Sequence, residues 1–279
     1  MTIDFPVEQT VKARYSVRTY EQRTLPAELK EKLNRYAAVL ANPFSVKVSF
    51  RLLEAVTREG GQKLGTYGMI KGASEFIGAT VPDCALALEA LGYDFEKLIL
   101  YATHLGLGTC WLGGTFTRSA FTAAMQVKPD ALFPAISPVG YPAKKRFAEN
   151  LVRKVTKADS REPWSALFFN DTFNAPLTEN EAGTYAFPLE MLRLAPSASN
   201  KQPWRIVRDA NAFHFYEQKA PGYSDKLSVD IQRVDIGIGA CHFHLAALEK
   251  DLPGRFEQLP KPAIDLPANT HYIFSWVTE

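Results

Sequence analysis

The sequence predicts an α+β fold in which two similar halves are fused in one chain. Each half has the same order of elements: a helix pattern, a turn rich in proline and serine, a strand pattern, and a long helix of small apolar residues that ends near glycine. Residues 89–111 match residues 234–256 at a constant shift of 145, which places Gly92 on Gly237. The recurrence of this order indicates an internal duplication more strongly than single matches of small residues do.

We expect residues 1–169 to form the first half and residues 170–279 the second. Apolar residues at helical spacing after Pro26 predict a helix that ends before Asn42 and Pro43. The other elements expected in this half are strands over 46–52 and from 73 to 77, a helix over 84–105 with a possible break at Gly92, a glycine turn over 106–114, and a strand over 132–139.

In the second half, a helix pattern begins near Leu189 and gives way to an irregular loop over 194–205. Two strands, over 205–207 and around Phe213 and Phe215, are expected to pair across a short turn. A helix over 234–250 and a strand over 270–277 that closes the sheet complete the list of expected elements.

Composition and charge exclude several classes of function. The chain has 279 residues, 46% of them hydrophobic and 22% charged, which is an ordinary globular composition. A net charge of +2 gives no basic surface for nucleic acid or for a membrane. We see no signal peptide and no apolar run long enough to span a membrane. Three widely spaced cysteines, expected to be buried and reduced, favour a cytoplasmic protein.

Arg14, Ser16 and Arg18 alternate along a segment that we expect to be extended. Residues two apart on an extended chain project to the same side, so both guanidinium groups and the hydroxyl would converge. Such a cluster suits a phosphate group, because charge-assisted hydrogen bonds to it are strong. A solvated edge strand with alternating charge would show the same pattern. The basic run over 144–161 is another source of phosphate contacts, or a solvated face.

The loop over 194–205 contains Pro196, Ser197, Ala198 and Asn200. Small residues let a flat ligand approach the backbone closely, and serine and asparagine side chains can reach its polar edge. An ordinary connection from a helix to a strand would also look like this. Residues 111–114, with a tryptophan, a leucine and two glycines, suit a wall for a planar ring.

The sequence shows no constellation for nucleophilic or metal catalysis. Ser197 and Ser199 lack a nucleophile-elbow motif, and no histidine can be paired with them. His242 and His244 are two residues apart on a helix, so they do not share a face for a metal ion. An enzyme without reactive side chains of its own usually depends on a cofactor.

These segments together resemble the nitroreductase family of FMN-dependent oxidoreductases. Residues 14–20 are similar to that family's Arg-Arg-Ser-Ile-Arg start, residues 105–114 to its glycine-rich turn, and residues 194–205 to its Ala-Pro-Ser segment. Gly140-Tyr141-Pro142 and the basic residues after it resemble the family's C-terminal tail. The order differs from that of an ordinary member, because residues 40–45 hold only a degenerate Ala-Pro-Ser segment. The chain therefore resembles the internally duplicated branch of the family, a fused pseudo-dimer with one complete site.

The resemblance implies one FMN per chain and assigns roles to twelve residues. Arg14, Ser16 and Arg18 would hold the phosphate, with help from Lys157 and Arg161, although Lys144, Lys145 and Arg146 compete for that role. The remaining implied contacts to the ribityl chain and the ring come from Leu112, Gly113, Gly114, Pro196, Ser197, Ala198 and Asn200. A backbone N–H of this glycine turn would lie near flavin N5. Residues 67–71 would form the variable edge of the ring site.

The implied activity is a ping-pong reaction in which NAD(P)H reduces FMN and a nitroaromatic, quinone or similar acceptor then takes the electrons. Two alternatives stay open: an FMN-binding or storage protein without turnover, and a duplicated structural domain without a cofactor. The resemblance implies no catalytic side chain and no metal. A monomeric pseudo-dimer is expected, with further dimerisation left open.

Overall fold

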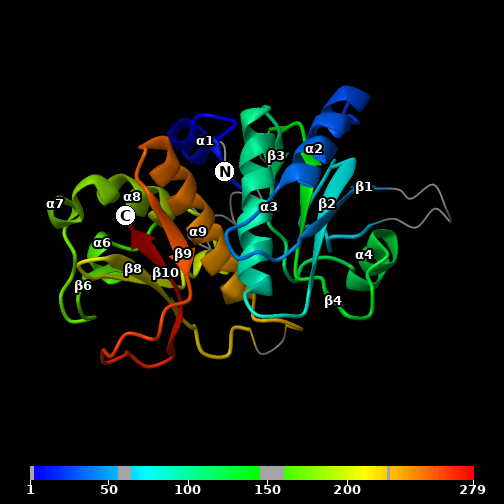
Figure 1. Ribbon diagram of the computed structural model, residues 1–279. Helices are drawn as coiled ribbons and strands as arrows, with labels where there is room; N and C mark the ends of the chain where they lie inside the picture. Colours follow the sequence, from blue (N-terminus) through cyan, green and yellow to red (C-terminus); the bar gives the residue numbers. More distant parts are fainter. Residues whose placement is uncertain (1–2, 56–63, 145–159, 225–226) are drawn as a thin grey trace.

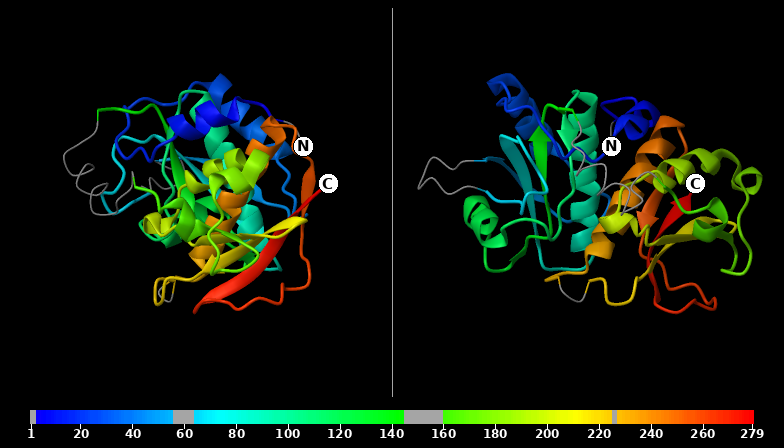
Figure 2. Two further views of the ribbon diagram at one scale, coloured as in Figure 1. Left: turned by 90° about the vertical axis from the view of Figure 1, so that its left-hand side faces the viewer. Right: turned by 180° about the vertical axis from the view of Figure 1, so that it is seen from behind.

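The computed structural model describes residues 3–55, 64–144, 160–224 and 227–279. Two sheets flank a central pair of long helices, α3 (Ala87–His104) and α9 (Ile231–Glu249), which lie side by side in the middle of the molecule (Figures 1 and 2). Helices α3 and α9 pack against each other along their length. The predicted α+β fold with two similar halves is confirmed.

The first sheet has the strand order β1-β2-β5-β3, with β4 paired to β2. Its strands are β1 (Ser49–Glu54), β2 (Glu75–Pro82), β3 (Gly108–Thr109), β4 (Ala131–Leu132) and β5 (Ile136–Gly140), all antiparallel to their neighbours. The helices of this half are α1 (Val7–Ala13), α2 (Ala27–Val39), α3 and α4 (Arg118–Met125). The helix predicted after Pro26 is confirmed as α2.

The second sheet has the order β6-β7-β8-β10-β9. Its strands are β6 (Phe168–Asn170), β7 (Trp204–Arg208), β8 (Ala212–Gln218), β9 (Gly254–Glu257) and β10 (Thr270–Thr278), and only the β6–β7 pair is parallel within this sheet as described. Its helices are α6 (Trp164–Leu167), α7 (Glu179–Ala182), α8 (Ala186–Arg193) and α9, with short 3₁₀ turns η1 (Gly183–Tyr185) and η2 (Ala198–Asn200). Because β1, β2, α3, β3 and β5 recur as β7, β8, α9, β9 and β10, the two halves are similar.

The crossing of α3 and α9 has the symmetry that the shift of 145 predicts. A Cβ atom on Gly92 would lie 2.1 Å from the carbonyl oxygen of Val234, and one on Gly237 would lie 2.0 Å from that of Glu89. Val234 follows Glu89 by the same 145 positions that separate the two glycines. Each glycine therefore lets the other helix approach its backbone, in two contacts related by a pseudo-twofold axis.

Several details of the predicted elements are wrong. The possible break at Gly92 does not occur, because α3 is continuous and the glycine serves the helix contact instead. The expected strand over 132–139 is two strands, separated by a segment that contains Pro134, which has no N–H group for a ladder. Strand β10 lies inside its sheet and not at an edge, because β9 pairs with its outer side.

The cysteine prediction is confirmed in part. Cys110 and Cys241 are buried and free, whereas Cys84 is free but exposed. Cys84 lies in the short connection before α3, outside both sheets and the helix core. Among the described residues no helix is long and apolar enough to cross a membrane, and no cluster of histidine, cysteine and carboxylate groups could hold a metal ion.

The main hydrophobic core extends across both halves. It contains apolar residues of α3, such as Leu98 and Ile99, in one continuous cluster with Phe243 and Leu245 of α9. We propose that the boundary between the halves lies ahead of Phe168, since β6 pairs with β7 of the second sheet. The boundary predicted between residues 169 and 170 falls inside β6.

Candidate functional site

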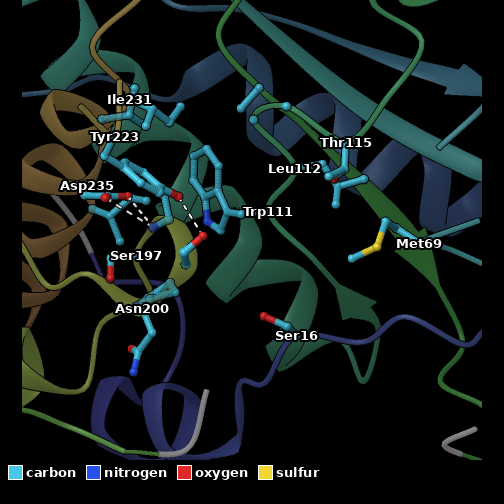
Figure 3. Close-up of a pocket in the computed structure, with 18 of the residues that line it drawn as sticks. Ser16, Met69, Trp111, Leu112, Thr115, Ser197, Asn200, Tyr223, Ile231 and Asp235 are labelled. Atoms are coloured by element: carbon cyan, nitrogen blue, oxygen red, sulfur yellow. Dashed lines mark hydrogen bonds between the residues drawn. The ribbon is translucent and has the colours of Figure 1, made fainter. Parts of the chain in front are cut away.

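A cavity of about 510 Å³ lies between the two halves. Four segments far apart in the sequence form its walls: residues 14–18, residues 111–115, the loop over 194–200, and the first two turns of α9. Figure 3 shows Ser16, Trp111 and Leu112 facing Ser197, Asn200 and Asp235 across this space. Every one of the twelve predicted contact residues lines the cavity except Lys157, which lies outside the described residues.

The Arg14–Arg18 segment is extended, as predicted. Ser16 forms a parallel bridge with Thr109, and the N–H of Val17 donates to the Thr109 carbonyl oxygen at 2.8 Å. Val17 is buried on the opposite side, in the small core of the first half, so the two arginines and Ser16 share the cavity side. The Nε and Nη1 atoms of Arg18 are buried and have no hydrogen-bond partner in the described part of the chain.

The turn after α3 is held by two sets of hydrogen bonds. Leu112 and Ile136 exchange backbone hydrogen bonds of 2.9 and 3.0 Å. Arg118 on α4 donates from Nη2 to the Gly113 carbonyl oxygen at 2.9 Å, and from Nη1 to the carbonyl oxygen of Phe133. In a trans peptide the C=O and N–H groups point in opposite directions, so Arg118 fixes the orientation of the N–H of Gly114.

The loop over 194–200 has an unusual backbone. Ser199 and Asn200 have φ values of +48° and +56°, and Gln202 just beyond has +47°. Such left-handed conformations cost free energy for residues other than glycine and persist only where the surroundings impose them. Here the Ala198 N–H donates to both carboxyl oxygens of Asp235 at 3.0 and 3.1 Å. The loop therefore has a defined conformation that the contact with Asp235 holds in place.

Arg161 belongs to the predicted phosphate set, and it also holds the loop. Its Nη2 donates to the Leu194 carbonyl oxygen at 3.0 Å, and its Nη1 lies 3.5 Å from the Asn200 side-chain oxygen. The Asn200 amide in turn donates to the Ser160 carbonyl oxygen at 3.1 Å. This basic residue of the first half therefore ties the loop of the second half to the segment around Ser160. Lys144 does not line the cavity, and Lys145 and Arg146 lie outside the described residues.

Asp235 is a cavity residue that sequence reasoning missed. Only 2% of it is exposed, and burial first, then repulsion from Glu217 and Asp230, raises its pKa well above the usual range of a carboxyl group. It lies on the first turns of α9, with Ile231, Val234 and Ile238 beside it on the cavity wall. The shift of 145 could have drawn attention to this helix, because it aligns α9 with the helix that precedes the glycine turn.

Tyr223 is a second residue that the sequence did not reveal. Its hydroxyl donates to the Ser199 side chain at 2.7 Å, as drawn in Figure 3. It lies in the connection between β8 and α9, which has no distinctive sequence pattern. Of the predicted ring-edge segment 67–71, Met69 lines the cavity, whereas Tyr67 is 71% exposed.

The position related to this cavity by the pseudo-twofold axis is filled with aromatic rings. Phe256 corresponds to Trp111 at the shift of 145, and Phe44 lies in the degenerate copy of the Ala-Pro-Ser loop. The Phe44 ring centroid is 5.8 Å from that of Phe256, 5.0 Å from that of Phe274 and 6.1 Å from that of Tyr93. At the cavity, the segment of Trp111 and the loop over 194–200 leave space between them. At the related position, the corresponding residues Phe256 and Phe44 are in contact.

A family model described as "Putative TM nitroreductase" matches residues 6–247, which is most of the chain. The chain belongs to this nitroreductase family. A crystal structure described as a putative nitroreductase from Thermotoga maritima is 18% identical to this nitroreductase-family chain, with a TM-score of 0.65. The match covers 100% of this chain and 96% of that one, so the whole duplicated fold is shared.

Other solved structures align with about half of this chain. A nitroreductase with bound FMN from Bacteroides fragilis is 20% identical, covers 52% of this chain and 94% of its own, and gives a TM-score of 0.41. An FMN-dependent nitroreductase from Clostridium difficile is 18% identical, covers 49% of this chain and 88% of its own, and gives a TM-score of 0.40. No curated protein matches the sequence.

Proposed function

We propose that the chain binds one FMN in the cavity between its halves and acts as an NAD(P)H-dependent oxidoreductase of nitroreductase type. The phosphate would lie among Arg14, Ser16 and Arg18, and the ring between the glycine turn and the loop over 194–200. Support comes from the family membership and from the eleven predicted contact residues that line one cavity.

The observation that carries this proposal is the state of Arg18. Its guanidinium group adjoins the cavity with two buried nitrogen atoms that lack partners among the described residues. Buried donors of this kind cost free energy unless a ligand satisfies them, and a phosphate dianion provides several charged acceptor oxygens. The Ser16 hydroxyl on the same side of the extended segment adds a further donor.

The residues of the chain position and shield the cofactor. Bound FMN would supply the capacity to accept two electrons from NAD(P)H and to pass them to a second substrate. Arg118 fixes the Gly113–Gly114 peptide, so a backbone N–H of fixed direction is available at the ring wall. Asp235 fixes the loop through Ala198, and Trp111, Leu227 and Ile231 add apolar surface that excludes water.

NAD(P)H and the acceptor would use the same cavity in turn, which is a ping-pong order. We infer nitroaromatics, quinones or compounds of similar shape as acceptors, because apolar and aromatic residues such as Trp111, Leu227 and Ile231 line much of the cavity. A flavin-binding protein without turnover is the alternative. Anaerobic reduction of the bound flavin distinguishes the two: NADH or NADPH would reduce the flavin of an enzyme, but not that of a binding protein without turnover.

The first test is FMN binding by the purified protein, followed by visible absorbance and by quenching of FMN fluorescence. We expect a bound flavin spectrum, and we expect Arg18→Ala to weaken FMN binding at least about tenfold, or ~1.4 kcal/mol. Arg35→Ala is the matched control, because Arg35 is exposed on α2 and pairs only with Glu31 among the described groups. A wild-type protein that neither carries nor binds FMN would overturn the proposal.

A further inference from the structure

Glu96 is a buried carboxyl group at the junction of the two halves. It lies in the middle of α3 and has no exposed surface. Trp111 of the cavity wall donates from Nε1 to Glu96 Oε2 at 2.7 Å, and His242 of α9 has Nε2 2.9 Å from Glu96 Oε1. One side chain of the first half is thus joined both to the ring wall and to the central helix of the second half.

Hydrogen-bond geometry sets the number of protons on this pair. His242 Nδ1 lies 3.0 Å from the Met191 carbonyl oxygen, which can only accept, so Nδ1 carries a proton. A second proton lies between His242 Nε2 and Glu96 Oε1, on one atom or the other. With two protons, the pair is either an imidazolium with a carboxylate or a neutral imidazole with a carboxylic acid. Its net charge is zero in both cases.

The net charge of the Glu96–His242 pair affects Arg14, which lies beside it. Its Nε lies 3.8 Å from Glu96 Oε1, and its side chain is only 7% exposed while it lines the cavity. A carboxylate without the histidine proton would place a full negative charge beside Arg14, at a distance where charges interact strongly in a buried setting. That charge would draw the guanidinium group away from an anion in the cavity and would repel the anion.

We propose that Glu96 and His242 form a neutral buried bridge that positions Arg14 and Trp111 and keeps the positive charge of Arg14 available to a phosphate. This inference rests on the proposed function, because the anion is the phosphate of FMN. Glu96 and His242 are positioning residues, since they act through Arg14 and Trp111. The bridge also makes anion binding by the first half depend on a side chain of the second half.

The test compares the affinities for FMN and riboflavin, which share the ring and ribityl chain but differ in the phosphate. We expect the wild type to prefer FMN. His242→Gln keeps a hydrogen-bond donor but removes the proton that balances Glu96. We expect it to lower the preference for FMN over riboflavin at least about tenfold, the effect of an unbalanced charge near the phosphate. The double variant Glu96→Gln/His242→Gln replaces both groups by neutral amides, so no charge is left unbalanced, and it should restore the preference.

His271→Gln is the matched control, because His271 is exposed on β10. A merely structural role for the pair predicts equal losses for both flavins and no recovery in the double variant, and this result would overturn the inference. So would an unchanged preference in His242→Gln. Nitrogen NMR of the His242 ring in the flavin-free wild type gives a readout without any cofactor: Nδ1 must be protonated. A wild type that binds neither flavin while Nδ1 is protonated would overturn the proposed function, and the positioning role with it.

Discussion

Glu217 on β8 is a completely buried carboxyl group whose two oxygen atoms have no hydrogen-bond partner among the described residues. In the described part of the chain, the Lys219 ammonium group lies 3.9 Å from Glu217 Oε2. Burial first, and then repulsion from Asp230, raises the pKa of Glu217 from its ordinary value of 4.5 to about 7. At pH values between these two, the Glu217 carboxyl group is therefore mostly protonated in the folded protein and mostly ionised in the unfolded chain.

This raised pKa predicts a pH dependence of stability. Between pH 4.5 and 7 the folded state binds more protons than the unfolded state, so the free energy of unfolding falls as the pH rises through this range. The contribution of Glu217 is on the order of 3 kcal/mol, at ~1.4 kcal/mol for each pKa unit. In Glu217→Gln this contribution is absent.

Urea unfolding at pH 4.5 and pH 8.5 measures the effect. We expect the stability of Glu217→Gln, relative to wild type, to increase by about 3 kcal/mol between the two pH values. Glu31→Gln, at an exposed position of α2, is the control and should show little change. If the difference in stability between Glu217→Gln and wild type did not change with pH, the raised pKa of Glu217 would be contradicted.

At the level of single residues, sequence reasoning succeeded where a short segment carries the information. The alternation of Arg14, Ser16 and Arg18 was enough to predict that their side chains share a side, because an extended chain fixes that geometry locally. Asp235 and Glu96 were not found, because a buried carboxyl group on an apolar helix gains its meaning from partners in other elements.

The contact between α3 and α9 is the element on which both halves depend. Gly92 and Gly237 allow it, because any side chain at either position would meet the backbone of the other helix at about 2 Å. Gly239 lies on the same helix as Gly237, but a Cβ atom there would be 3.4 Å from the nearest atom, in the Trp204 ring. Substitutions at these three glycines can therefore distinguish the effect of helix packing, at Gly92 and Gly237, from the effect of helix propensity, at Gly239.

We expect Gly92→Ala and Gly237→Ala each to lower the free energy of unfolding by about 1–3 kcal/mol or more, the cost of forcing a methyl group into a packed contact. Gly239→Ala should be close to neutral, or more stable by up to ~1 kcal/mol, because alanine favours the helix. Thermal and urea unfolding of the three variants measure these changes. Equal effects at all three positions would contradict the assigned crossing.

The helices and strands were largely predictable because their periodicity is local. Helix α2, strand β8 and helix α9 follow from apolar spacing. The missed elements are short or irregular: α1, α4, β3 and β9 bury few residues, so they leave little pattern. The possible break at Gly92 does not occur for a different reason, since a glycine in a helix can serve close packing instead of a kink.

For the whole molecule, the two halves have unequal roles. One interface position retains a cavity with three arginines at its walls, whereas the pseudo-symmetric position is filled by Phe44 and three other aromatic rings. Among the described residues, the two interface positions are related by the duplication, and the aromatic contacts occupy the one that has no cavity.

We therefore expect a stoichiometry of one FMN per chain. Calorimetric titration of flavin-free protein, together with the molar mass of the complex in solution, measures it. The value should be close to one regardless of whether the chain is monomeric or forms a further dimer. A value near two would show that Phe44 and its neighbours move aside, and a value near one half would place the site between two chains.

The sequence by itself determined the duplication, the α+β character of both halves, and three of the four segments that form the cavity walls, because repeats, periodicity and short motifs can be recognised along the chain. Only the tertiary structure decided which segments meet. Residues 14–18 and the loop near residue 198 face the same cavity. The crossing of α3 and α9 places His242 against Glu96, and packing of α9 against the loop places Asp235 beside Ala198. These contacts join residues that lie far apart in the sequence, and their geometry depends on how two helix backbones pack, which no local pattern specifies.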